Sequence, residues 1–300
     1  MAWNSSMVLD ALRSSDLLEI GILANQIRLN LHPENVVTYE LRGMATSLEE
    51  ASRGAVSRGS SVNLSQIRDA EHIPLDTLRT SLLARHTQHG QVTFHHLPIS
   101  CLQAVDGIAL VETFRRLHEA GLRSLSANFY PTETASASTT QLAAVLRAAA
   151  ECDLLVSISI TIGNSESLEQ RVQTLATLRA LQDESNAIQA VLVRVYHAAT
   201  PEARREEEAT AVDYLKALAA TRLFLDNIEH LQTDWSVMGP KVLELALRFG
   251  ADDAGAIPWS QAGSPEPSHH GGESELRRII RDAGFRPVER DALFRQSLLR

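Results

Sequence analysis

The sequence predicts an α/β fold, a (βα) barrel of the TIM type, on three observations. Segments with strand-like and helix-like hydrophobic periodicity alternate along most of the chain, which is typical of a parallel sheet. Seven or eight such units follow one another, and that number favours closure of the sheet into a barrel. The chain has 300 residues, 44% of them hydrophobic, which suffices for one large core.

The first part of the chain is expected to lie before the barrel as a helix. Residues 7–31 carry apolar side chains at helical spacing, and a His-Pro pair ends the pattern. Three shorter segments follow: a strand at 36–41, a helix at 47–58, and a strand at 60–67 in which apolar and polar residues alternate.

Five strand–helix pairs and a last helix are predicted in the rest of the chain. In chain order they are 91–97 with 105–120, 122–129 with 139–150, 154–162 with 167–184, 188–196 with 203–225, 228–235 with 240–249, and 273–283. The helix at 240–249 is well marked, because Gly239-Pro240 precedes it and Gly250 follows it.

This pattern divides the chain into four parts. Residues 1–35 are an N-terminal helical extension, and residues 36–256 are the barrel. Residues 257–272 form a flexible loop rich in Pro, Gly and Ser, and residues 273–300 form a C-terminal helix and tail.

Composition excludes several classes of function. The net charge is −9 and there is no basic block, so nucleic acid is not an expected partner. Apolar runs such as 154–162 are too short to span a bilayer, and the N-terminus does not resemble a secretory signal, so we expect a cytoplasmic protein. Cys101 and Cys152 belong to no C-x-x-C pattern and are interpreted as small buried side chains.

Catalytic groups of such barrels lie where strands run into helices, at the carboxyl ends of the strands. The polar and aromatic residues at the predicted strand ends are His95, His96, Asn128, Tyr130, Glu133, Asn164, Glu166, Tyr196, His197, Asp234, Trp235, Asp252 and Asp253. No pair among them has a fixed metal-ligand spacing, so no metal site is predicted. There is also no G-x-S-x-G motif and no glycine loop for phosphate.

Four of these residues are candidates for catalysis: His95, Glu133, Asp252 and Asp253. Adjacent carboxylates shift each other's pKa, so the two aspartates predict an acid/base or cation site, but strand-end aspartates also cap turns. One of His95 and His96 is expected to face into the barrel, either to bind substrate or to pack through a hydrogen bond.

Four others are candidates for ligand binding: Trp235, Asn128, Asn164 and Tyr196. An indole ring at the mouth suits stacking on a purine-like or aromatic ligand, although Trp235 is equally compatible with a place in the core. The expected ligand is therefore a small aromatic or nucleoside-like molecule.

Six stretches of the sequence carry a family resemblance that runs in order over nearly the whole chain. They are LLEIGILANQIRLNLHPENVVTY (17–39), LHEAGLRSL (117–125), LRALQDES (178–185), ATAVDYLKALAATRLFLDNIEHLQTDW (209–235), GPKVLELALRFGADDAG (239–255) and ELRRIIRDAGFRPVERDALFR (275–295). The chain resembles the menaquinone-pathway (futalosine) radical S-adenosylmethionine family of dehypoxanthine futalosine cyclase and aminofutalosine synthase. The resemblance implies a barrel of the radical S-adenosylmethionine kind.

The resemblance also implies a C-x-x-x-C-x-x-C loop soon after the VVTY stretch, where three thiolates hold a [4Fe–4S] cluster that binds S-adenosylmethionine. This chain has no such loop between Leu41 and Ser47, so its first βα unit is truncated. Cys101 and Cys152 cannot replace the three thiolates. We therefore expect no cofactor.

Other family patches also differ in this chain. A glycine-rich segment is replaced by residues 124–133, which leaves Glu133 displaced from the family's glutamate. A Gly-His pair appears as Gly163-Asn164, and the family's G-A-N-D appears with Asp252 in place of the amide.

Two classes of function follow from these differences. The first is a degenerate homologue, or pseudoenzyme, that acts as a binding, scaffolding or regulatory protein linked to menaquinone biosynthesis. The second is an enzyme: either a cyclase-like enzyme of the futalosine pathway with a cluster supplied by a partner, or a non-radical enzyme that uses the barrel pocket. A homodimer or a complex with a pathway enzyme fits either class.

Overall fold

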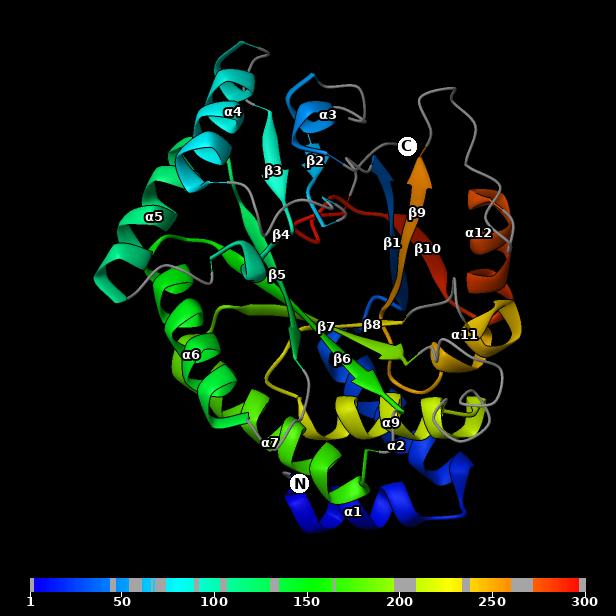
Figure 1. The fold of residues 1–300 in the computed structure, drawn as a ribbon. Helices are drawn as coiled ribbons and strands as arrows, with labels where there is room; N and C mark the ends of the chain where they lie inside the picture. Colours follow the sequence, from blue (N-terminus) through cyan, green and yellow to red (C-terminus); the bar gives the residue numbers. More distant parts are fainter. Residues whose placement is uncertain are drawn as a thin grey trace, which may run out of the picture.

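The computed structural model describes twelve stretches of the chain. They are residues 3–43, 47–53, 61–65, 67, 74–88, 92–102, 107–129, 135–163, 166–196, 209–233, 238–259 and 272–296. Parallel strands surrounded by helices confirm the predicted α/β barrel of the TIM type (Figure 1).

The strands form one eight-stranded sheet and one two-stranded sheet, and all paired strands are parallel. The strands are β1 (Val36–Gly43), β2 (Ser61–Asn63), β3 (Thr93–His95), β4 (Leu97–Pro98), β5 (Ser124–Phe129), β6 (Leu155–Ile162), β7 (Ile188–Val195), β8 (His230–Thr233), β9 (Asp253–Trp259) and β10 (Arg286–Glu289). The large sheet has the order β10-β1-β9-β8-β7-β6-β5-β4, and β2 pairs with β3. Pairing of the first strand with β9 is what curls the sheet into a barrel.

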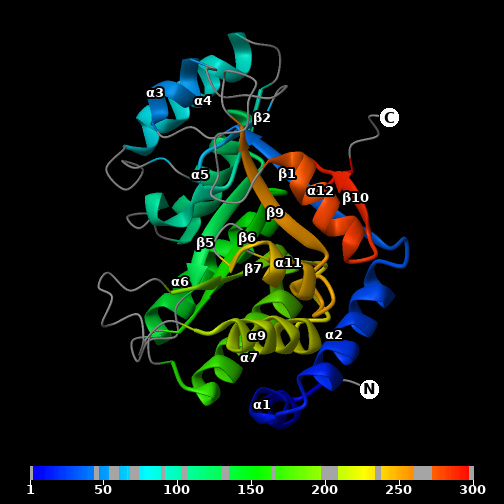
Figure 2. The same cartoon turned by 90° about the vertical axis from the view of Figure 1, so that its right-hand side faces the viewer.

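Helices cover the outside of the strands (Figures 1 and 2). They are α1 (Ser5–Arg13), α2 (Leu17–Leu31), α3 (Leu48–Arg53), α4 (Leu75–Gln88), the 3₁₀ helix η2 (Ile99–Leu102), α5 (Gly107–Glu119), α6 (Ala135–Glu151), α7 (Leu168–Ser185), α9 (Ala211–Phe224), α11 (Pro240–Ala246) and α12 (Glu273–Asp282). Within the part of the chain that the structure describes, no helix combines the length and the hydropathy needed to cross a bilayer.

The N-terminal extension is two helices, whereas the sequence predicted one over residues 7–31. The break comes at the Ser-Ser-Asp sequence between α1 and α2, where the Asp16 carboxylate accepts a hydrogen bond from the Glu19 N–H at 2.9 Å. This contact caps α2 and starts a second helix at an angle to the first. Both helices pack against α9 on the outside of the barrel (Figure 2).

The predicted strand 91–97 is interrupted at His96, whose φ of 57° is left-handed. The residue separates β3, which pairs with β2, from β4, which pairs with β5. The left-handed backbone at this one residue redirects the chain between the two strands. Residues 93–98 therefore pair with β2 through β3 and with β5 through β4.

The predicted loop 257–272 begins three residues too early, because β9 continues to Trp259. Its remaining part at 260–271 lies outside the described residues. The elements α4, η2 and β10 were not predicted, and β10 adds a strand to the outer edge of β1.

Candidate functional site

The register of the sheet defines which side chains face the lumen, the space that the strands enclose. A row of register partners runs through Asn128 on β5, Ser159 on β6, Leu192 on β7, Gln232 on β8 and Asp253 on β9. Register partners in a sheet point to the same face. The alternate residues of the strands are buried beneath the helices, so this row faces the lumen.

Along β6 the lumen face consists of small hydroxyl residues: Ser157, Ser159 and Thr161. Each is half-buried, whereas the isoleucines between them, such as Ile158 and Ile160, are buried. A packed barrel fills its interior with bulky branched side chains. Small, partly exposed side chains at these positions therefore fill the lumen less than branched side chains would.

The polar lining continues onto the neighbouring strands. Ser126 on β5 lies beside Ser157 and is half-buried, and Asn128 lies beside Ser159 and is exposed. On the other side Arg194 of β7 is the register partner of Thr161 and is also exposed. Hydroxyl, amide and guanidinium groups thus converge on the carboxyl half of the lumen.

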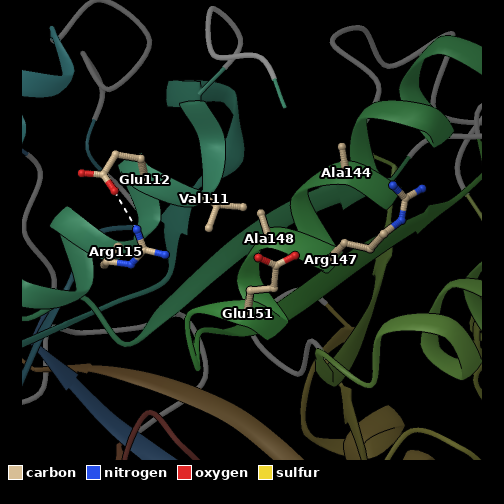
Figure 3. Close-up of a pocket in the computed structure, with 7 residues that line it drawn as sticks. All are labelled: Val111, Glu112, Arg115, Ala144, Arg147, Ala148 and Glu151. Atoms are coloured by element: carbon tan, nitrogen blue, oxygen red, sulfur yellow. Dashed lines mark hydrogen bonds and ion pairs between the residues drawn. The ribbon is translucent and has the colours of Figure 1, made fainter. Parts of the chain in front are cut away.

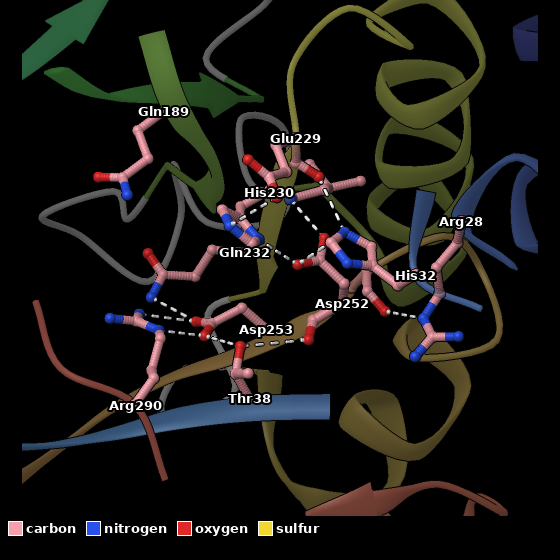
Figure 4. Close-up of polar contacts among 12 residues, drawn as sticks. Arg28, His32, Thr38, Gln189, Glu229, His230, Gln232, Asp252, Asp253 and Arg290 are labelled. Carbon is pink, nitrogen blue, oxygen red and sulfur yellow. Dashed lines mark hydrogen bonds and ion pairs between the residues drawn. The ribbon is translucent and has the colours of Figure 1, made fainter. Parts of the chain in front are cut away.

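The amino end of the lumen is closed by a buried ion cluster around Asp253 and Arg290 (Figure 4). The Arg290 guanidinium donates to both Asp253 oxygens and, at 3.2 Å, to the Glu40 carboxylate. Gln232 donates to Asp253 Oδ1 at 2.9 Å and the Thr38 hydroxyl to Oδ2 at 2.6 Å. Burial opposes the charge of Arg290, but Asp253 and Glu40 raise its pKa above the ordinary value.

A second buried cluster, centred on Asp252, lies next to the first (Figure 4). Asp252 Oδ1 accepts from Arg222 Nη2 at 2.5 Å and from the Leu231 N–H at 2.7 Å. Oδ2 lies 2.8 Å from His230 Nδ1 and 3.4 Å from His32 Nε2. Burial opposes ionisation, but the hydrogen bond from His230 and the charge of Arg222 hold the pKa of Asp252 well below its usual range.

The predicted place of the two aspartates, at the carboxyl mouth, is wrong. Asp253 is the first residue of β9 and Asp252 precedes it, so both lie at the amino end of the barrel. Gly250, with a φ of 102°, closes the turn after α11, and the strand begins after the Gly-Ala-Asp-Asp sequence and not before it. Their catalytic role stays a prediction, and in this structure each carboxylate forms an ion pair with a buried arginine.

His95 also lies nearer the amino end than predicted. Phe94 bridges to Leu122 and Leu97 pairs with Leu125, so His95 is level with the start of β5. Its Nε2 lies 2.9 Å from the Thr93 hydroxyl. Burial lowers the pKa of His95 to about 4, despite the opposing charges of Glu40 and Asp291, so the imidazole is neutral at pH 7.

Of the predicted ligand-binding residues, Asn128 faces the lumen and Tyr196 is half-buried directly after β7. Glu166 forms an ion pair with Arg171, with 3.0 Å between Oε2 and Nη2. Burial raises the pKa of the Glu166 carboxyl group. The other predicted residues at the mouth, Tyr130, Glu133, Asn164, His197, Asp234 and Trp235, lie outside the described residues.

The lumen hydroxyls were not among the predicted site residues, although their signal is present in the sequence. The β6 sequence LVSISITI alternates hydroxyl and aliphatic residues with the period of a strand. It was used only to predict a strand. Within a barrel, the same alternation distinguishes the residues that face the lumen from those that face the helices.

A separate groove of about 520 Å³ lies between α5 and α6 (Figure 3). Its floor is formed by small apolar residues such as Val111 and Ala148, and its charged rim includes an ion pair of 2.7 Å between Arg115 and Glu112. The groove is on the outer helical layer. It is therefore distinct from the lumen and from both buried clusters.

Comparison with known proteins gives relatives that include futalosine-pathway synthases and 5-amino-6-(D-ribitylamino)uracil–L-tyrosine 4-hydroxyphenyl transferases. Residues 199–298 match the family model of the CofH/MqnC C-terminal region. Cyclic dehypoxanthine futalosine synthase of Halalkalibacterium halodurans is 30% identical, over 92% of this chain and 86% of the relative. The Streptomyces coelicolor protein of the same name is 27% identical, over 67% of this chain and 54% of the relative. Aminodeoxyfutalosine synthase of Thermus thermophilus is 33% identical, over 50% of this chain and 42% of the relative.

Solved structures support the fold. Methylornithine synthase (PylB) superposes with a TM-score of 0.66 at 14% identity, covering 96% of this chain and 94% of that structure. The hydrogenase maturase HydG from Carboxydothermus hydrogenoformans gives a TM-score of 0.68 at 13% identity, covering 98% and 78%. At these identities the likeness concerns the architecture of the barrel alone.

The expectation that no cofactor is involved is contradicted by these relatives, because they are radical S-adenosylmethionine enzymes that use an iron–sulfur cluster and S-adenosylmethionine. The thiols of this chain nevertheless do not match the three-cysteine ligand set. β1 ends at Gly43 and α3 begins at Leu48, which leaves less room than the eight residues of a C-x-x-x-C-x-x-C loop. Cys152 lies after α6, where its thiol donates to the Val111 carbonyl. We therefore derive no reaction step through a cluster.

Proposed function

Since the chain belongs to the futalosine-pathway radical S-adenosylmethionine family, we propose that it acts in menaquinone biosynthesis by binding a futalosine-type ligand in the barrel lumen. The observation that carries this proposal is the lining of β5 and β6: Ser126, Asn128, Ser157, Ser159 and Thr161. Hydroxyl and amide side chains can donate to and accept from the hydroxyl groups of a sugar. The ligand class is a small nucleoside-like molecule.

The finer role that we propose is that of a binding protein for a pathway intermediate. The chain's own side chains supply hydrogen bonds around the lumen, and the Asp253–Arg290 cluster closes its amino end against water. A ligand would therefore enter from the carboxyl end. A homodimer or a complex with a pathway enzyme remains a prediction from the sequence.

The second candidate function is catalysis of the family's cyclase reaction. It is favoured by the alignment with cyclic dehypoxanthine futalosine synthase, which extends over 92% of the chain. This function needs an external source of cluster ligands, because the chain contains only two cysteines.

Thermal-shift measurements test the proposal. The purified protein is titrated separately with futalosine, with its dehypoxanthine derivative and with S-adenosylmethionine. A ligand that binds the native state raises the melting temperature with concentration. We expect a shift with at least one futalosine-type compound. No shift with any of them at millimolar concentration would contradict the proposal.

Anaerobic reconstitution with iron and sulfide separates the two candidate functions. A stoichiometric [4Fe–4S] absorption band together with reductive cleavage of S-adenosylmethionine would establish the cyclase-type reaction. Ligand binding without either signal supports the role of a binding protein.

A further inference from the structure

We propose that His32, His230 and Asp252 form a binding site for a divalent transition-metal ion of the zinc class at the amino end of the barrel. The imidazole nitrogens and the carboxylate oxygen that these residues offer all lie within 4.8 Å of one another, and all three residues are buried. The site is separate from the lumen hydroxyls, so it does not depend on the proposed function.

The spacing of the ligand atoms suits such an ion. Asp252 Oδ2 lies 2.8 Å from His230 Nδ1 and 3.4 Å from His32 Nε2, and the two imidazole rings stack with centroids 5.3 Å apart. Tetrahedral zinc with bonds of about 2.0–2.2 Å holds its ligand atoms about 3.3 Å apart. Small side-chain shifts therefore bring the three atoms into a coordination shell.

The carboxylate is held in the orientation that coordination requires. Both hydrogen bonds from Arg222 and from the Leu231 N–H go to Asp252 Oδ1. Oδ2 is left facing the two imidazole rings (Figure 4). Metal-binding carboxylates are commonly fixed by hydrogen bonds to the oxygen that does not bind the metal.

Each histidine has a carboxylate near its other ring nitrogen. Glu34 Oε1 lies 3.8 Å from His32 Nδ1, and Glu229 Oε1 lies 3.9 Å from His230 Nε2. A carboxylate at the remote nitrogen orients a metal-binding imidazole and increases its basicity. The Glu229 main-chain oxygen, 3.0 Å from His32 Nε2, is the nearest candidate for a fourth ligand.

The charges near the site are mixed. Asp252 and Glu34 act on the guanidinium charge of Arg28, and Asp252 also acts on that of Arg222. Burial of all three ligands is typical of a structural metal site rather than a catalytic one. The ion would join the end of α2 to the starts of β8 and β9.

The sequence predicted no metal site because the three ligands come from segments far apart in the chain. His32 follows α2, His230 begins β8, and Asp252 precedes β9. No spacing motif can reveal such a set. Only the closure of the barrel brings the segments together.

Zinc binding to the intact protein is the first test. The protein is stripped with a chelator, dialysed against Zn²⁺, and its metal content measured. We expect one zinc per chain and a melting temperature that rises with the zinc concentration. A protein that retains no stoichiometric zinc overturns the proposal.

Substitutions then assign the ligands. His32→Gln and His230→Gln should each lower zinc affinity by roughly tenfold or more, as loss of a ligand contact requires. His118→Gln, a histidine on α5 outside the cluster, is the matched control and should retain full affinity. Equal affinity in all three variants overturns the assignment.

X-ray absorption of the zinc-loaded, unaltered protein keeps the test independent of whether the variants fold. We expect scattering from two imidazole ligands and oxygen neighbours. A spectrum with fewer than two imidazoles overturns the proposal.

Discussion

Arg290 holds both carboxylate oxygens of Asp253, through Nε to Oδ2 at 2.5 Å and through Nη2 to Oδ1 at 3.0 Å. Asp253 is the first residue of β9, and Arg290 directly follows β10. Both residues are buried. The same guanidinium lies over the Phe294 ring, with 3.8 Å from Cζ to the centroid. The segment after β10 thus plugs the amino end of the barrel, and a ligand site is left at the other end.

Loss of the Arg290 guanidinium should lower the free energy of unfolding substantially. Arg290→Met leaves the carboxylates of Asp253 and Glu40 buried without their cation. Removal of one partner from a buried ion pair typically costs about 3–5 kcal/mol. We expect a loss of that size in the free energy of unfolding, measured by urea denaturation at pH 7.

Arg295→Met is the matched control, because its ion pair with Asp291 is at the surface, with 74% of the arginine side chain exposed. Exposed pairs contribute about 0–1 kcal/mol. Similar losses in both variants would contradict the account of a buried plug.

The neutral imidazole of His95 predicts a dependence of stability on pH. Its folded-state pKa of about 4 lies below the value of about 6.5 expected in the unfolded chain, so the unfolded chain takes up the proton first. Stability from this group is complete above about pH 6.5 and is lost as the pH falls towards 4. At about 1.4 kcal/mol per pKa unit the loss is about 3 kcal/mol.

His95→Gln keeps a hydrogen-bonding side chain but cannot be protonated. The free energy of unfolding of the variant should fall less steeply between pH 6.5 and 4 than that of the unaltered protein. Parallel pH profiles, from denaturation at several pH values, would show that His95 is not the group responsible.

Two features of the structure require glycine at position 250: the left-handed backbone conformation and the close approach of a neighbouring side chain. Its φ is 102°, and a Cβ there would lie 2.7 Å from Arg222 Cβ. Gly284 also has a positive φ, of 89°, but its Cβ would meet its nearest neighbour at 3.5 Å. We expect Gly284→Ala to cost about 1–2 kcal/mol from the backbone alone, and Gly250→Ala to cost more.

Thermal unfolding of the two variants measures this difference. Gly250→Ala also pushes on the arginine that holds Asp252, so its loss should be the larger one. Equal melting temperatures would mean that the turn yields without strain.

Some elements could be predicted from the sequence because their signals are local, and the start of α11 is marked by Gly239-Pro240. The helix predicted over 203–225 was given an earlier start than α9, which begins at the capping box of Thr210 and Asp213. The break at Ser14 was missed because apolar periodicity continues across it. Contacts between distant segments, such as that of Arg290 with Asp253, have no local signal.

The candidate site was less predictable than the fold for the same reason. Whether a residue such as Asp252 lies at the mouth or the amino end depends on which side of it the strand begins. A shift of a few residues in that boundary moves the side chain to the other end of the barrel. Asn128, at the end of a well-marked strand, lies on the lumen face, and its role in ligand binding stays a prediction.

Substitutions on the two faces of β6 should change the free energy of unfolding by different amounts. Ile160→Ala removes a buried side chain beneath the helices and should cost about 2–5 kcal/mol. Ser159→Leu adds volume on the half-buried lumen face and should change the free energy of unfolding by less than Ile160→Ala does. Urea denaturation of both variants compares the two faces, and a larger loss for Ser159→Leu would mean that the lumen is packed.

Calorimetric titration of the unaltered protein and of Ser159→Leu with futalosine and its dehypoxanthine derivative tests the central claim most directly. We expect one of these ligands to bind the unaltered protein at one site per chain. Because the leucine occupies the lumen, the variant should bind at least about tenfold more weakly, a loss of about 1.4 kcal/mol. Equal affinity in the two proteins, or no binding of either ligand to the unaltered protein, would contradict a ligand site in the lumen.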